Sequence, residues 1–96
     1  MSLPITAQQM SALRALKRTH PSLGELATAV ALAFDASKIA NPEMARLILE
    51  TTCRRIAKGE IGSHDVMIQH LEHFGSLECL SAQQVTDFSI RIKRLS

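Results

Sequence analysis

The sequence predicts an all-α protein, a compact bundle of about five short helices that form a single domain over residues 1–96. Its apolar residues are mainly aliphatic: twelve Leu, twelve Ala and eight Ile stand against three Phe and no Trp or Tyr. This composition favours helices over strands. Helix-start signals recur along the chain, and no strand-like alternation bounded by hairpin turns is present in the sequence.

The first helix is expected over residues 6–18. Thr6 and Gln9 have the spacing of a capping box, in which the Thr hydroxyl accepts the amide hydrogen of Gln9 and the Gln side chain accepts that of Thr6. The helix is expected to end before Pro21, because proline disfavours helical geometry in the residue before it. Its expected buried side chains are Met10, Leu13 and Leu16.

A second capping box, Ser22 with Glu25, predicts a helix over residues 22–38. Apolar side chains repeat along it at i, i+3, i+4 and i+7 spacing, which is typical of a helix with one buried face. The expected core positions are Leu23, Leu26, Ala27, Val30, Ala31 and Phe34. The other faces are apolar too, with Ala29, Leu32, Ala33 and Ala36. A helix that is apolar nearly all round is either central in the fold or shared with another chain.

Asn41 followed by Pro42 predicts the start of a third helix, because the fixed φ of proline suits the first helical position. Gly59 is its expected end. The expected buried positions are Ala45, Ile48, Leu49, Thr52, Cys53 and Ile56, and the expected solvent-facing positions are Arg46, Glu50, Arg54 and Lys58.

Two further helices complete the predicted bundle. Ser63 is expected to cap a helix that runs to Phe74, before Gly75, and Ser81 with Gln84 forms a third capping box at the start of the last helix. The expected buried positions are Met67, His70, Leu71 and Phe74 in the fourth helix, and Val85, Phe88, Ile92 and Leu95 in the fifth.

The net charge and the hydropathy of the chain limit which classes of function the sequence supports. The net charge of +2, from eleven basic and nine acidic residues, does not by itself indicate a nucleic acid, a membrane surface or an acidic substrate as partner. The longest uncharged apolar stretch, residues 26–34, is about half of a membrane span. No secretory signal pattern is present at the amino terminus, so we expect a cytoplasmic protein without a membrane partner. Cys53 and Cys79 have no CxxC spacing and are expected to be free thiols.

The candidate chemical groups do not form a recognisable active site. Near Cys79 the sequence holds His64, His70 and His73. A zinc ion needs three or four converging ligands, and helical geometry turns His64 away from the other two histidines. Ser63, His64 and Asp65 are no catalytic triad, because neighbours on a helix project about 100° apart. We therefore expect no metal, no cofactor and no enzymatic activity.

Nine of the eleven basic residues fall near the ends of the first, third and fifth predicted helices. They are Arg14, Lys17, Arg18, Arg54, Arg55, Lys58, Arg91, Lys93 and Arg94. In one interpretation these cations only complement the helix dipoles. In the other, the three helices run parallel and their ends merge into a basic tip that binds phosphate or an acidic protein. The third and fourth helices also have the order of a helix-turn-helix, but the fourth, which would read the DNA, has no Arg or Lys.

The leading hypothesis is a non-enzymatic protein–protein interaction module. It acts as a homodimer, or as a small adaptor, chaperone, regulator or inhibitor that docks on another protein. The hypothesis rests on the excess apolar surface of the helix expected over residues 22–38, and its candidate partner-binding residues are Ala29, Leu32, Ala33 and Ala36. The alternative is a nucleic-acid-binding regulator that uses the basic helix ends.

Overall fold

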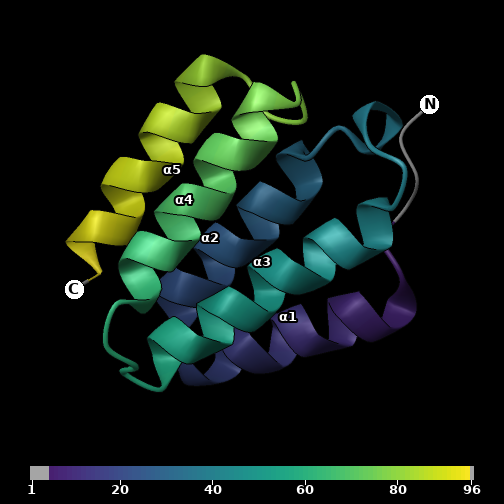
Figure 1. Ribbon diagram of the computed structural model, residues 1–96. Helices are drawn as coiled ribbons and strands as arrows, with labels where there is room; N and C mark the ends of the chain where they lie inside the picture. Colours follow the sequence, from purple (N-terminus) through teal and green to yellow (C-terminus); the bar gives the residue numbers. More distant parts are fainter. Residues whose placement is uncertain (1–4, 96) are drawn as a thin grey trace.

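The computed structural model describes residues 5–95, and it is 79% helical with no strand among those residues (Figure 1). The five helices are α1 (Ala7–Thr19), α2 (Pro21–Ala33), α3 (Pro42–Ala57), α4 (Ser63–Ser76) and α5 (Ala82–Arg94), and a short 3₁₀ helix, η1 (Ala36–Lys38), lies between α2 and α3. The predicted all-α bundle is confirmed. None of the helices in the described part of the chain is both long and apolar enough to cross a membrane.

Helix α2 occupies the centre of the bundle, as the sequence predicts. It packs against α1, α3 and α5, while α3 also contacts α1 and α4. Leu26, Val30 and Phe34 are each only 1% exposed. Successive helices alternate in direction, so that α1, α3 and α5 all end toward the left and lower left of Figure 1.

Three predicted helix starts are confirmed by their hydrogen bonds. The Thr6 hydroxyl accepts from the Gln9 backbone N–H at 3.1 Å, and the Gln9 side chain accepts from the Thr6 N–H at 3.4 Å. Ser81 and Gln84 make the same pair of bonds at 3.1 and 2.9 Å. At the start of α3, Asn41 Oδ1 accepts from the Met44 N–H at 3.1 Å.

The predicted bounds of α2 are wrong at both ends. The helix begins at Pro21 with His20 as its N-cap, so Ser22 lies inside the first turn and the Ser22–Glu25 capping box does not form. The helix ends at Ala33 because Phe34 is extended, at φ −65° and ψ 119°, and turns its ring into the core. The Asp35 N–H then donates to the Cys79 carbonyl at 2.8 Å, which ties this loop to the one after α4.

Helix α4 also differs from the prediction. Gly62, at φ 80°, is its N-cap, and glycine adopts this left-handed conformation without steric cost. Ser63 is fully buried as the first helical residue, and its hydroxyl donates to the Glu60 carbonyl at 2.6 Å rather than capping the helix. The helix continues past Gly75 to Ser76. Gly59, at φ 73°, does terminate α3 as predicted.

The core is aliphatic around a pair of phenylalanines. The rings of Phe34 and Phe74 meet edge to face with centroids 5.3 Å apart, which joins the end of α2 to α4. Most predicted core positions are buried, but Ile48 is 36% exposed, and four others are only half-buried: Met10, His70, Val85 and Leu95. Conversely, Arg46 and Glu50 were expected on the solvent side of α3 and are buried.

Candidate functional site

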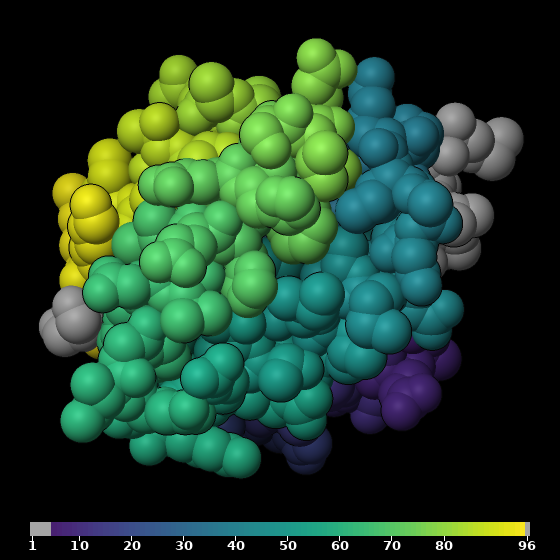
Figure 2. Space-filling view, in the orientation of Figure 1, coloured from purple at the N-terminus to yellow at the C-terminus, as the bar shows by residue number. Residues whose placement is uncertain are grey.

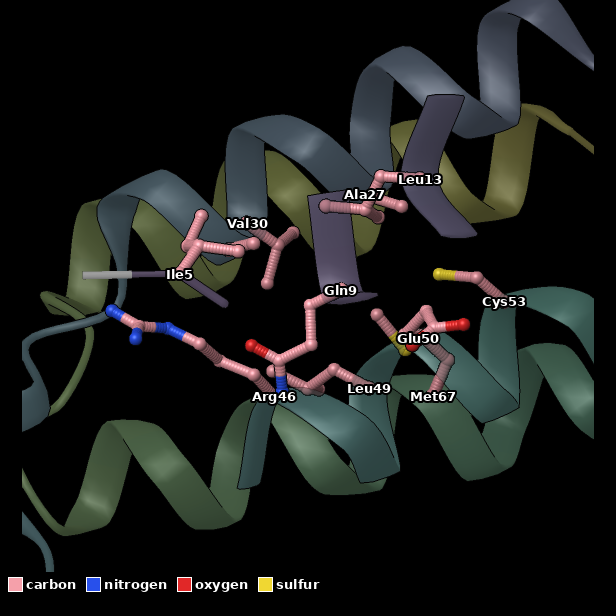
Figure 3. A pocket seen from close by; sticks show the side chains of 11 residues that line it. Ile5, Gln9, Leu13, Ala27, Val30, Arg46, Leu49, Glu50, Cys53 and Met67 are labelled. Carbon is pink, nitrogen blue, oxygen red and sulfur yellow. The ribbon is translucent and has the colours of Figure 1, made fainter. Parts of the chain in front are cut away.

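A small, partly enclosed cavity lies between α1, α2, α3 and α4, shown in Figure 3. Its walls carry Gln9, Arg46 and Glu50 among apolar side chains such as Leu13 and Val30. In Figure 3, Arg46 extends toward Ile5, whereas Glu50 points the other way, toward Cys53. The cavity measures about 10 Å³, which is space for about one water molecule. It is too small to hold a substrate or an organic cofactor.

The polar side chains around this cavity have protein partners. Gln9 Nε2 donates to the Glu43 carbonyl at 3.0 Å, and Glu50 Oε1 lies 3.0 Å from Arg54 Nη2. The Arg46 guanidinium lies 5.9 Å from the centroid of the Phe34 ring, within the range of a cation–π contact. Gln9 and Arg46 thus join the starts of α1 and α3 to the end of α2, which is a structural role for these buried polar groups.

Both cysteines are free thiols in the structure and both are buried. Burial raises the pKa of Cys53 to about 12, and the neighbouring Glu50 carboxylate adds to the shift. Burial also raises the pKa of Cys79, with Asp35 contributing. Because the thiolate is the reactive form, neither side chain has the environment of a nucleophile at neutral pH.

The histidines of α4 do not converge. Burial lowers the pKa of His70, and the nearby His73 and Arg55 contribute. His73 is exposed at the surface and its ring lies against Phe74, with centroids 5.4 Å apart. Within residues 5–95, no group of three or more His, Cys, Asp or Glu side chains is placed to hold a metal ion.

The ends of α1, α3 and α5 gather at one end of the molecule, which we call the basic end. It comprises the second halves of these three helices, the first halves of α2 and α4, and the loop after α3. A shared hollow there is lined by His20 before α2, Ala57 of α3 and Leu95 after α5. The nine basic residues that were expected near helix ends all lie at this end. Four carboxylates lie there too: Glu25, Glu50, Glu60 and Asp65. The opposite end holds the remaining two cations and five carboxylates.

Arg54 and Arg55, at the basic end, both form ion pairs. Arg55 donates from Nε and Nη2 to the two carboxylate oxygens of Glu60, at 3.0 and 2.9 Å, and this hydrogen bonding lowers the pKa of Glu60. Arg54 pairs with Glu50 and stays half exposed. Arg55 is therefore a poorer candidate for binding a partner than its position in the sequence indicates.

A groove separates the second halves of α1 and α3, and we call it the α1–α3 groove. Its floor is formed by small and aliphatic side chains: Ala12, Ala15, Leu16 and Ala57. Arg54 and Lys58 line its α3 side, while Thr19 and His20 close its end. The hollow measures about 320 Å³ and is open to solvent.

The outward side of α3 carries an apolar surface that the sequence analysis missed. We call it the α3 face, and it consists of Met44, Leu47 and Ile48, which are 49%, 40% and 36% exposed. Side chains of α3 and α4 form most of the side of the molecule seen in Figure 2. The signal was present in the sequence, because Met44 and Leu47 are apolar residues outside the predicted buried stripe of this helix.

The four candidate partner-binding residues of the sequence analysis do not form one surface. Leu32 is 69% exposed at the end of α2, whereas Ala36 is buried in η1, since α2 ends before it. Ala29 and Ala33 are half-buried and pack against the core. Of these four residues, Leu32 is the one with a strongly exposed side chain.

Helices α3 and α4 form an antiparallel pair rather than presenting a DNA-reading helix. Among the exposed residues of α4 are two carboxylates, Asp65 and Glu72, together with Gln69 and His73. These carboxylates would repel phosphate groups, so the helix-turn-helix interpretation loses support.

Comparisons with protein-family models, with curated proteins and with solved structures find no significant match to this chain.

Proposed function

We propose that the chain is a non-enzymatic docking module that binds another protein through the α3 face. The observation that carries the proposal is the clustering of three large apolar side chains, Met44, Leu47 and Ile48, on adjacent turns of one helix. Single exposed apolar residues are normal on a folded protein, but a contiguous apolar patch is typical of an interaction site.

The chemistry of the interior supports the same proposal. The cavity has room for about one water molecule, and both cysteines have raised pKa values. Of the polar side chains that line the cavity, Gln9 of α1 bonds to the α3 backbone, and Glu50 pairs with Arg54 within α3. These features favour a binding role over a catalytic one.

The test compares two surface substitutions of the same kind. Leu47→Glu places a carboxylate on the α3 face, and Leu32→Glu places one at the exposed end of α2. Each variant is immobilised and its captured proteins are quantified by mass spectrometry against wild type, while light scattering of each free variant measures self-association. We expect a partner, or a second copy, to be lost from Leu47→Glu and retained by Leu32→Glu, because an unpaired carboxylate in an interface is costly.

The opposite pattern would identify Leu32 as the anchor, in accordance with the interaction hypothesis drawn from the sequence, and would move the binding site away from the α3 face. If neither substitution changes self-association or any captured protein, the docking proposal is wrong. Circular dichroism of both variants provides the control that the helices remain folded.

Nucleic-acid binding is the second candidate function. The observation that favours it is the gathering of three helix ends with nine cations. Since Arg54 is paired with Glu50 and Arg55 with Glu60, the informative charge reversal is Lys17→Glu with Lys58→Glu. A gel-shift titration on duplex DNA at two salt concentrations tests it: binding that falls steeply with salt and disappears in the double variant would support this function.

A further inference from the structure

We propose that the α1–α3 groove binds an acidic amphipathic helix of a protein partner. This inference rests on the proposed docking function and names the surface and the chemistry of the partner. The groove runs between two neighbouring helices that point in the same direction, at the basic end of the molecule (Figure 1).

The floor of the groove selects apolar side chains. Ala12, Ala15 and Ala57 are small, so the backbone of a third helix can approach α1 and α3 closely between them. The polar groups at the closed end are used within the chain: the Thr19 hydroxyl donates to the Leu16 carbonyl at 3.2 Å, and the His20 N–H donates to the same carbonyl at 2.7 Å. A polar ligand would therefore find few hydrogen-bond partners on the floor.

The α3 rim of the groove selects negative charge. Lys58 and the half-exposed Arg54 line the α3 side. On α1, Arg14, Lys17 and Arg18 line a separate hollow on another side of the helix. No carboxylate is among the residues that line the α1–α3 groove in the described part of the chain. An amphipathic helix with an apolar stripe and Glu or Asp on the side that faces α3 satisfies the floor and the cationic rim together.

The same rim continues into the α3 face. Met44, Leu47, Thr51, Arg54 and Lys58 are spaced alternately by three and four residues, so they form one row along the outward side of α3. A partner helix that lies along this row would contact apolar side chains at one end of α3 and cations at the other. The groove and the α3 face are thus parts of one elongated surface.

A nucleic acid fits this groove less well. Phosphate groups gain nothing from an alanine floor, and the bases of a single strand bind mainly by stacking on aromatic side chains. All three phenylalanines of the chain are buried, and the sequence contains no Trp or Tyr. We therefore infer a protein helix, and nucleic-acid binding becomes an outcome of the test.

Two substitutions test the shape of the groove and the charge of its rim separately. Ala15→Arg fills the groove while adding a cation, and Ala15 is exposed, so the helix tolerates the change. Its matched control is Gln8→Arg, which adds the same charge two turns earlier on the same side of α1. Lys58→Glu reverses a rim charge, with Arg94→Glu of α5 as its control.

The probe is a fluorescein-labelled synthetic helical peptide with a leucine stripe flanked by glutamates, and its counterpart carries lysines in place of the glutamates. Binding is measured by fluorescence anisotropy, and circular dichroism confirms that each variant is folded. We expect the acidic probe to bind the wild type and to bind Ala15→Arg and Lys58→Glu at least about tenfold more weakly. Both control variants should stay within about twofold of the wild type, and the lysine probe should not bind.

Three results would overturn the inference: no binding of the acidic probe, equal or tighter binding of that probe to Ala15→Arg, or equal binding of the two probes. Duplex DNA that binds Ala15→Arg more tightly than the wild type would instead assign the basic end to nucleic acid. The proposed function is tested separately by Leu47→Glu. If that variant loses its partner and Ala15→Arg keeps it, docking through the α3 face stands and the groove inference fails.

Discussion

At the scale of single residues, close approach between helices limits the sequence at Gly24. A Cβ atom added there would lie 2.4 Å from Lys17 Cα and 2.5 Å from Lys17 N, so α1 and α2 touch through backbone at this point. No side-chain rotation relieves such a contact. The helical hairpin of α1 and α2 therefore depends on the absence of a side chain at position 24.

Gly24→Ala is expected to destabilise the protein by about 1–3 kcal/mol, although the same change in an open helix would be stabilising. Urea denaturation measures the effect. Gly75→Ala is the comparison, since the added Cβ there meets mainly the Val85 Cγ2 atom, at 2.7 Å, which moves when its side chain rotates. A Gly24→Ala variant as stable as the wild type would show that the two helices are further apart.

The buried thiol of Cys53 predicts a pH dependence at the same scale. Its pKa is about 12 in the folded protein, against about 8.5 for a free cysteine, so the unfolded chain loses this proton first as the pH rises. The contribution to stability is complete below about pH 8.5 and is lost as the pH rises toward 12, by up to roughly 1.4 kcal/mol per pH unit.

Stability measured by urea denaturation at a series of pH values should therefore fall more steeply above pH 9 for the wild type than for Cys53→Ala. Parallel curves for the two proteins would contradict the burial of this thiol. Alkylation with iodoacetamide adds a second measurement, because the native thiol should react only after unfolding.

At the scale of elements, a helix begins at its predicted capping box only where no other start signal stands beside the box. The boxes at Thr6 and Ser81 form because both residues stand in extended backbone directly before the helix, within reach of the glutamine three residues later. The box expected at Ser22 does not form, because Pro21 already occupies the first helical position and begins the helix one residue earlier.

This difference predicts unequal costs for three alanine substitutions. Thr6→Ala and Ser81→Ala each remove a cap and should cost about 1 kcal/mol, whereas Ser22→Ala should cost less than about 0.5 kcal/mol. Denaturation midpoints of the three purified variants give the comparison. If Ser22→Ala lowers the free energy of unfolding as much as Thr6→Ala does, the capping box predicted at Ser22 does form.

At the scale of the whole molecule, alternating helix directions sort the charges. Cations concentrate toward the C-terminal ends of α1, α3 and α5, where they also complement the helix dipoles, and these ends lie together. A protein with a formal net charge of only +2 therefore presents one strongly basic end and one acidic end.

Two substitutions of equal net charge test this polarity. Lys17→Glu and Lys38→Glu each lower the formal net charge by two, but Lys17 lies at the basic end and Lys38 lies at the opposite end, 3.9 Å from Glu78. On a heparin column at neutral pH, Lys17→Glu should elute at lower salt than Lys38→Glu, because binding follows the local field rather than the total charge. If the two variants elute at the same salt concentration, heparin binding follows the net charge and not the local concentration of cations.

The fold class, the number of helices, most of the core and two capping boxes could be predicted from the sequence, because apolar periodicity and cap residues act over a few neighbouring positions. The sequence also predicted that the nine cations lie together if the first, third and fifth helices run parallel. In the fold, α1, α3 and α5 do run in the same direction. The end of α2 at Ala33 could not be predicted from the sequence. It depends on the packing of the Phe34 ring against Phe74 and on the hydrogen bond from the Asp35 N–H to the Cys79 carbonyl.

The apolar residues that face water could not be predicted, because their exposure depends on contacts between helices. Ala36 and Leu47 both lie outside the predicted buried stripes and Ile48 lies within one, yet Ala36 is buried whereas Leu47 and Ile48 are exposed on α3. The burial of Arg46 and Glu50 was likewise decided by neighbours far along the chain, from Gln9 to Met67. The side of a helix that becomes a surface depends on which other helices cover it, and that is a property of packing between distant segments.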